Sequence, residues 1–165
     1  MKLGSPYAAQ ARADTPLGPV TLAATAHGLA GVWFDGQAHH PGALDAPLDD
    51  TQPHLAQARR ELDEYFAGTR TRFDVALDAA GTPFQCSVWA ALARTGHGRT
   101  TSYGAIARAL GRAAAVRAVG AAVGRNPLSV IVPCHRVLGH DGALTGYAGG
   151  LERKTALLRL EGAAR

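Results

Sequence analysis

The sequence predicts an α+β protein built from two unlike parts. In the first part, two apolar segments, residues 18–25 and 29–36, are separated by only three residues, which is typical of a β-hairpin. In the second part, from residue 82 onward, short segments of helical spacing follow one another, each bounded by a capping residue or a glycine. Of the 165 residues, 47% are hydrophobic and 18% are charged, which indicates a globular chain and excludes a disordered or fibrous one.

The remaining elements of the first part follow from local pattern. Residues 54–67 repeat apolar side chains at helical spacing and predict a helix that ends at Gly68. The preceding stretch, 37–53, contains three prolines and predicts a loop. Residues 72–77 alternate enough to predict one more strand. Because no catalytic grouping occurs in this half, we expect residues 1–78 to form a scaffold domain.

The second part is expected to form a mainly helical domain over residues 79–165. Thr82 offers an oxygen cap and is followed by proline, so a helix should begin there. Two short helices, 103–110 and 113–123, flank a turn at Gly111 and predict a helix-turn-helix. The second of these helices is nearly all Ala, Val and Gly, which lets its backbone approach a DNA groove closely. From the pattern alone, a small-residue packing helix is the alternative, and it is the commoner one.

The two halves differ in charge. Residues 1–80 carry 6 basic and 10 acidic residues, a net −4, whereas residues 81–165 carry 11 and 3, a net +8. Fifteen of the 17 basic residues are arginines, whose planar fork suits phosphate oxygens. A biased codon usage would account for the arginines but not for the asymmetry. We therefore expect a polyanionic partner, first nucleic acid and then a membrane surface, and no membrane span, because no run of about 18 apolar residues occurs.

The compartment can be inferred from the cysteines and the N-terminus. Two cysteines are too few for a disulfide framework, and the first residues lack the apolar core of a secretory signal. A reducing, cytoplasmic location is therefore expected.

A chemical site is predicted around Cys134. The apolar run 130–132 leads into Pro133, Cys134, His135 and Arg136. The thiolate is the nucleophilic form of cysteine, and a basic neighbour raises its population. A buried, inert cysteine is the alternative, and the Cys-His pair alone does not decide between them.

The surrounding motifs favour a reactive Cys134 over an inert one. They are GTPFQ at 81–85, SYG at 102–104, AVRAVG at 115–120, PCHRV at 133–137, LTGYAGG at 144–150 and K..LL..EG at 154–162. In this order they resemble the O6-alkylguanine-DNA alkyltransferases, also called methylated-DNA–protein-cysteine methyltransferases. The resemblance implies a ribonuclease H-like N-terminal domain and a single-turnover DNA-repair enzyme. It further implies a monomer acting on double-stranded DNA, which flips out O6-alkylguanine, and also O4-alkylthymine, and keeps the alkyl group irreversibly on its own cysteine. No cofactor and no metal are expected.

The same resemblance implies roles for four catalytic residues. Cys134 would accept the alkyl group, and His135 would take its proton through a bridging water. Glu161 would orient and stabilise His135, as in a hydrolase triad. Asn126 would support the active-site turn.

Further residues are implied for DNA and for the base. Arg117 would fill the stack vacated by the flipped nucleotide, and the Tyr103 hydroxyl would protonate guanine at N3. The expected DNA-binding and flipping set is Arg117, Tyr103, Thr101, Ser102, Ala118 and Arg125. The expected substrate pocket is Tyr103, Val137, Tyr147, Ala148 and Gly149, with backbone carbonyls reading the exocyclic amine.

Departures and alternatives remain. The first half has no cysteine, so a zinc site of the kind found in some relatives is not expected. Cys86 is expected to be a packed thiol, and Ser129 stands where some relatives carry proline. Two other functions are open: a lesion binder of the alkyltransferase-like group, which lacks the acceptor cysteine, and a cysteine hydrolase using Cys134, His135 and Glu161.

Overall fold

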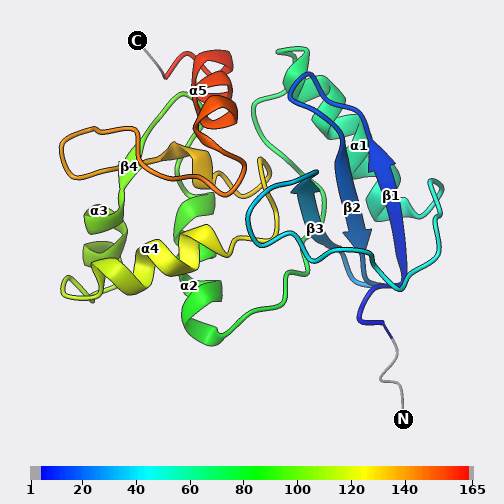
Figure 1. The fold of residues 1–165 in the computed structure, drawn as a ribbon, viewed down its shortest axis with the longest axis horizontal. Helices are drawn as coiled ribbons and strands as arrows, with labels where there is room; N and C mark the ends of the chain where they lie inside the picture. The colour runs from blue at the N-terminus through cyan, green and yellow to red at the C-terminus, as the bar shows by residue number, and fades with distance from the viewer. Residues whose placement is uncertain (1–4, 164–165) are drawn as a thin grey trace. The chain divides into compact units, whose positions relative to one another are not determined.

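The computed structural model describes residues 5–163 and confirms the α+β class. The chain divides after Ala79 into two compact units, a sheet unit and a mainly helical unit (Figure 1). Within the described range, every helix is too short or too polar to span a bilayer.

A three-stranded antiparallel sheet forms the centre of the first unit. Its strands are β1 (Ala9–Ala13), β2 (Val20–Ala24) and β3 (Leu29–Phe34), in that order. The predicted hairpin is β2–β3, whose buried apolar side chains form the core of the unit. Strand β1 was not expected, because its sequence AQARA has low strand propensity. Its backbone pairing along β2 makes it a strand all the same.

Helix α1 (Pro53–Phe66) packs against this sheet and confirms the predicted helix within a residue (Figure 1). The predicted strand at 72–77 was wrong, since only Leu77 makes a bridge, to Leu29. The reason is Glu61 of α1, which is 1% exposed and whose Oε1 accepts the backbone N–H groups of Asp74 and Val75 at 2.8 and 3.1 Å. Donors taken by a carboxylate cannot join a sheet ladder.

Three helices pack together in the second unit. Helix α2 (Pro83–Ala93) begins with a complete capping box, in which Thr82 and Gln85 each accept the other's backbone N–H. Helices α3 (Tyr103–Ala109) and α4 (Val116–Gly124) contact each other and α2, and form the helix-turn-helix. Residues 113–115 lie in the turn, so α4 starts later than predicted.

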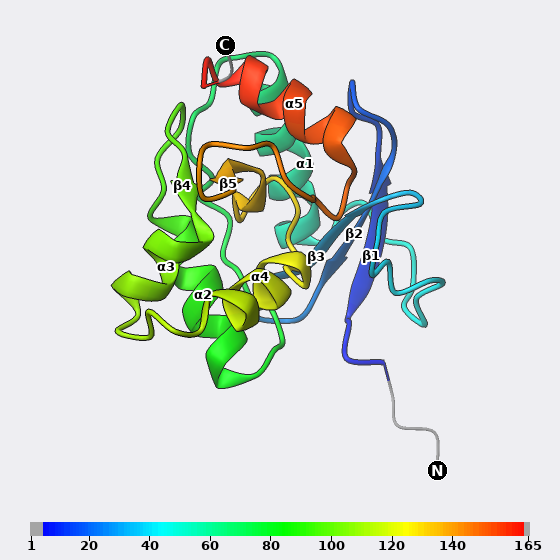
Figure 2. The same cartoon turned by 60° about the vertical axis from the view of Figure 1, so that its left-hand side comes forward.

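The rest of this unit holds the Cys-His-Arg segment, residues 134–136. Strand β4 (Thr101–Ser102) pairs in parallel with β5 (Val137–Leu138), as Figure 2 shows, and between them in sequence lies the short 3₁₀ helix η1 (Cys134–Arg136). Helix α5 (Leu151–Leu160) contacts η1. The Cys-His-Arg segment is thereby fixed by two elements distant in sequence.

Candidate active site

The loop before the cysteine is organised by Asn126. Its amide is 3% exposed; Nδ2 donates to the carbonyl of Val132 at 2.9 Å, and Oδ1 accepts the N–H of Leu128 at 3.0 Å. The loop needs this support because Val130 has φ +72°, a left-handed conformation that is strained for a β-branched residue. The same Nδ2 lies 3.2 Å from Cys134 Sγ. Asn126 therefore joins the shape of the loop to the position of the sulfur.

Cys134 is 4% exposed and opens η1 directly after Pro133. Burial raises the pKa of its thiol, and this outweighs the Asn126 hydrogen bond, the Lys154 charge and the Tyr147 hydroxyl, which lower it. The resting sulfur is therefore a neutral thiol. Reaction therefore requires a base that removes the proton from the thiol.

His135 and Glu161 form the expected pair. The imidazole Nε2 lies 2.8 Å from Glu161 Oε2, and both side chains are fully buried. The other ring nitrogen, Nδ1, is buried and has no hydrogen-bond partner within residues 5–163. Burial lowers the pKa of His135, although the Glu161 hydrogen bond and charge raise it. A neutral imidazole that donates Nε2–H to a carboxylate keeps Nδ1 free to accept a proton.

Arg136 does not act on the sulfur as a basic neighbour. Its guanidinium turns to Glu161, with Nε 2.8 Å from Oε1 and a terminal nitrogen 2.9 Å from Oε2, and also donates to the carbonyl of Thr95. The charge that the sequence placed next to Cys134 therefore serves the carboxylate behind His135.

Lys154 of α5 is a residue that sequence reasoning missed. It is fully buried, and its ammonium donates to the carbonyls of Val137 and Thr145 at 2.6 and 2.9 Å. It ties the segment after the cysteine to the loop that follows. The signal was available, because Lys154, Leu157 and Leu158 lie on one helical face that ends at Glu161.

A pocket of about 240 Å³ opens onto the sulfur. It is lined by Tyr103, Gly120, Val123, Gly124, Cys134, Gly146, Tyr147 and Ala148. The sequence analysis anticipated the two tyrosines and Ala148. It missed the wall formed by α4, which consists of Gly120, Val123 and Gly124, although these three positions share a helical face. That wall is nearly free of side chains, which leaves room for a planar group.

Two predicted pocket residues do not line this space. The carbonyl of Val137 already accepts from Lys154, so any contact with a base must share that oxygen. Gly149 is buried behind Tyr147, and a Cβ there would lie 2.7 Å from the tyrosine ring. Gly149 therefore sets where the Tyr147 ring can lie.

The predicted DNA-contacting residues lie on the helix-turn-helix and on the strand β4 that precedes it. Arg117 and Ala118 of α4 and Arg125, which caps its C-terminus, are exposed, while Val119 and Val123 are buried. Thr101 and Ser102 are half-buried in β4, and the Ser102 hydroxyl caps α3 by accepting from Ala105 N–H at 3.1 Å. The exposed face is thus small and basic, as a groove-docking helix requires.

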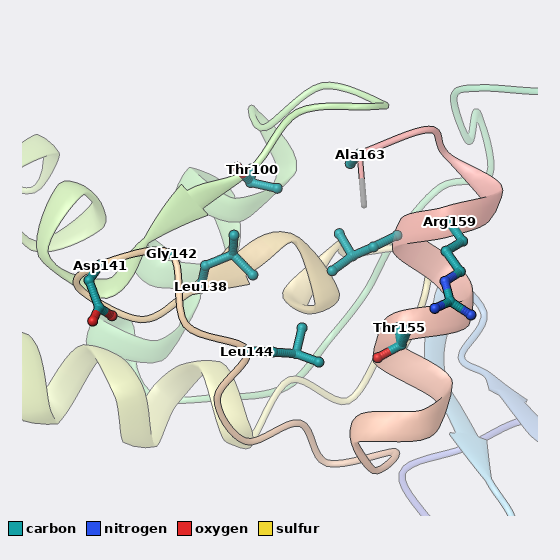
Figure 3. Close-up of a pocket in the computed structure, with 9 residues that line it drawn as sticks. Thr100, Leu138, Asp141, Gly142, Leu144, Thr155, Arg159 and Ala163 are labelled. Carbon is teal, nitrogen blue, oxygen red and sulfur yellow. The ribbon is translucent and has the colours of Figure 1, made fainter. Parts of the chain in front are cut away.

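A second hollow, of about 610 Å³, is larger but contains no nucleophile. Leu138, Leu144 and Thr155 lie around it, together with Arg159 of α5 (Figure 3). Cys86, expected to be packed, is exposed on α2. Among residues 5–163, His, Cys, Asp and Glu side chains form no cluster of three or more that could hold a metal.

Fold and site together define a protein of two compact units, the second of which holds a buried cysteine at a pocket partly lined by the second helix of a helix-turn-helix. Residues 10–79 match the family model of the 6-O-methylguanine DNA methyltransferase ribonuclease-like domain, and residues 83–163 match that of the 6-O-methylguanine DNA methyltransferase DNA-binding domain. The chain belongs to the 6-O-methylguanine DNA methyltransferase family. This confirms the resemblance inferred from the motifs.

Individual relatives agree. The chain is 47% identical over 148 residues to the methylated-DNA–protein-cysteine methyltransferase of Mycobacterium tuberculosis strain H37Rv, covering 90% of this chain and 88% of the relative. It is 46% identical over 149 residues to the enzyme of the same name from Methanosarcina acetivorans, covering 90% and 95%. A crystal structure of Mycobacterium tuberculosis OGT in complex with DNA superposes with a TM-score of 0.85 at 44% identity, covering 94% and 93%. The enzyme class predicted from the motifs is thereby confirmed.

Proposed function

We propose that this chain repairs DNA by moving the alkyl group of O6-alkylguanine, and also of O4-alkylthymine, onto Cys134, once per molecule. The observation that carries the proposal is the position of the Cys134 sulfur. It lies at a 240 Å³ pocket, 3.2 Å from the Asn126 amide, and the next residue in the chain is hydrogen-bonded to a buried carboxylate.

The proton on Cys134 has to leave before sulfur can attack. Burial raises the pKa of Cys134 and lowers that of His135, so both groups start neutral. His135 Nδ1 takes the proton through a bridging water, and Glu161 stabilises the imidazolium that results. The Asn126 N–H and the nearby Lys154 charge favour the thiolate as it forms.

Alkyl transfer is then an in-line displacement at carbon. A bond forms between Sγ and the alkyl carbon while the carbon–O6 bond breaks, and the electron pair passes into the purine. Tyr103, which lines the pocket, supplies a proton at N3 so that guanine leaves neutral. A thioether does not return its carbon to water, so the protein is consumed.

DNA docks through the helix-turn-helix in this proposal. The target atom lies inside the duplex, so the nucleotide must be extruded, which costs roughly a few kcal/mol. Arg117, exposed on α4, offsets that cost by occupying the vacated stack, while Arg125, Thr101, Ser102 and Ala118 contact the backbone and groove. The net charge of +8 over residues 81–165 supports phosphate contacts.

Location and oligomeric state complete the proposal. An acceptor thiol must stay reduced, which supports the cytoplasm. We place the protein there as a monomer, because one chain contains every group that the mechanism uses.

A mass measurement tests the function. The protein is incubated with duplex DNA carrying O6-methylguanine, and intact and peptide masses are recorded. We expect the mass of one methyl group on the Cys134 peptide, saturating at one equivalent, and none with Cys134→Ala. Cys86→Ala is the matched control, because it removes the exposed thiol and should leave the stoichiometry unchanged. Continued turnover of an ester would indicate a hydrolase, and binding without mass gain would indicate a lesion binder; either would refute the proposal.

A further inference from the structure

The carboxylate of Glu161 is placed where a negative charge is unfavourable. It caps the C-terminus of α5, the negative end of the helix dipole, and its side chain is fully buried. A buried carboxylate requires a positive partner and several hydrogen bonds to remain ionised. Glu161 therefore needs more than the single donor that His135 offers.

Arg136 supplies both the positive charge and the additional hydrogen bonds that Glu161 needs. Its guanidinium reaches both oxygens of Glu161, at 2.8 and 2.9 Å, and its third contact is the carbonyl of Thr95. The arginine is itself 7% exposed. Two parallel N–H···O bonds fix the plane of a carboxylate as well as its charge.

The backbone of Glu161 is confined by the same region of the chain. A Cβ at Gly98, which has φ +77°, would lie 3.1 Å from the Glu161 carbonyl oxygen. Thr95 and Gly98 belong to the loop after α2. That loop thus contacts the guanidinium of Arg136 through the Thr95 carbonyl, and it lies against the backbone of Glu161 at Gly98.

The charge balance gives this arrangement a consequence for His135. The charged groups acting on His135 are Glu161, which raises its pKa, and Arg136 and Lys154, which lower it. Without a counter-ion, a buried Glu161 would draw a proton onto the imidazole, its nearest remaining partner. A protonated His135 could not act as a base.

We infer that Arg136 is a positioning residue for alkyl transfer. Its guanidinium is the counter-ion of Glu161, which holds Glu161 against His135 while leaving His135 uncharged. This rests on the proposed function, and it gives Arg136 a role different from activating the thiol.

The test compares Arg136→Gln and Arg136→Lys with the unmodified protein. Single-turnover methyl transfer is followed from pH 6 to pH 9 and normalised to the fraction of protein that can be methylated, so that unfolded protein does not count. Arg136→Gln should slow transfer about 10- to 100-fold at pH 7, because the general base is lost. The rate of the unmodified protein divided by the rate of Arg136→Gln should fall toward 1 as pH rises, since His135 in the variant then regains its neutral form. Arg136→Lys keeps the positive charge, so its transfer rate at pH 7 should fall less than that of Arg136→Gln.

A spectroscopic readout separates this role from a structural one. In ¹⁵N NMR the two His135 ring nitrogens should report a neutral ring protonated at Nε2 in the unmodified protein and in Arg136→Lys. In Arg136→Gln they should report an imidazolium near pH 7. Arg12→Gln is the matched control, since it removes an exposed arginine fork on Asp35, at 2.7 and 3.3 Å, in the other unit.

Three results would overturn the inference: an unchanged rate, a rate loss that does not depend on pH while His135 stays neutral, or equal losses in the glutamine and lysine variants. Failure of the proposed function gives a different result, because transfer would then be absent from the unmodified protein or would persist in Cys134→Ala.

Discussion

Asn126→Ala is the substitution whose effect the structure defines most fully. It removes an acceptor from Leu128 N–H at 3.0 Å and a donor from the Val132 carbonyl at 2.9 Å, both buried. Each buried group left without a partner costs about 1–3 kcal/mol, so the two together should lower the free energy of unfolding by about 2–6 kcal/mol. The strained Val130 in the same loop gives the site little capacity to relax. For a domain of this size that loss corresponds to a fall in Tm of about 10 °C or more.

The variant should also react more slowly per folded molecule. The Asn126 hydrogen bond lowers the pKa of Cys134, so its loss raises that pKa further. The assay pairs urea unfolding with the rate of Cys134 alkylation by iodoacetamide as a function of pH, and the alkylation curve should move to higher pH. Gln37→Ala is the control: it removes a buried amide that accepts Phe34 N–H at 2.8 Å in the first unit, so it should destabilise that unit without moving the curve. A stability loss below about 1 kcal/mol, or an unmoved alkylation curve, would refute the reasoning.

Four further predictions follow from single contacts. Lys154→Met should move the alkylation curve of Cys134 to higher pH, because the Lys154 charge lowers the thiol pKa; an unchanged curve would contradict this. Gly149→Ala should slow methyl transfer with little effect on DNA affinity, because the new methyl group displaces the Tyr147 ring; the two are measured by quenched-flow transfer and fluorescence anisotropy. Burial lowers the pKa of His135 below 6.5, so the unfolded chain binds that proton first, and unfolding free energy should fall as pH drops below about 6.5; urea titrations in which His135→Gln keeps the same slope would count against it. DNA affinity should fall steeply with added salt, as measured by titration at several ionic strengths, and a flat response would argue against phosphate contacts.

Elements specified by local chemistry were predicted well. Thr82 and Pro83 start α2 as expected, and Gly68 follows α1 with φ +79°. The hairpin of β2 and β3 also formed where the turn residues indicated. Capping, turn formation and helical spacing depend on residues a few positions apart, so they can be read from the chain directly.

Elements that depend on distant partners were not predicted. The segment 72–77 failed to become a strand because Glu61 took two of its donors, while β1 became one because β2 offered an edge. No local pattern contains either fact. The same limit applied to Arg136, whose partner Glu161 lies 25 residues away.

The sequence by itself determined that this chain contains a cysteine followed by a histidine, a carboxylate and a basic helix-turn-helix, since these are matters of residue type and order. Only the tertiary structure decided the protonation states and the pairings. Burial makes the resting thiol and imidazole neutral, and the fork of Arg136 closes on Glu161 rather than approaching the sulfur. The physical reason is that a charge is governed by its distance from other charges and from water, and both are fixed only when the chain has folded.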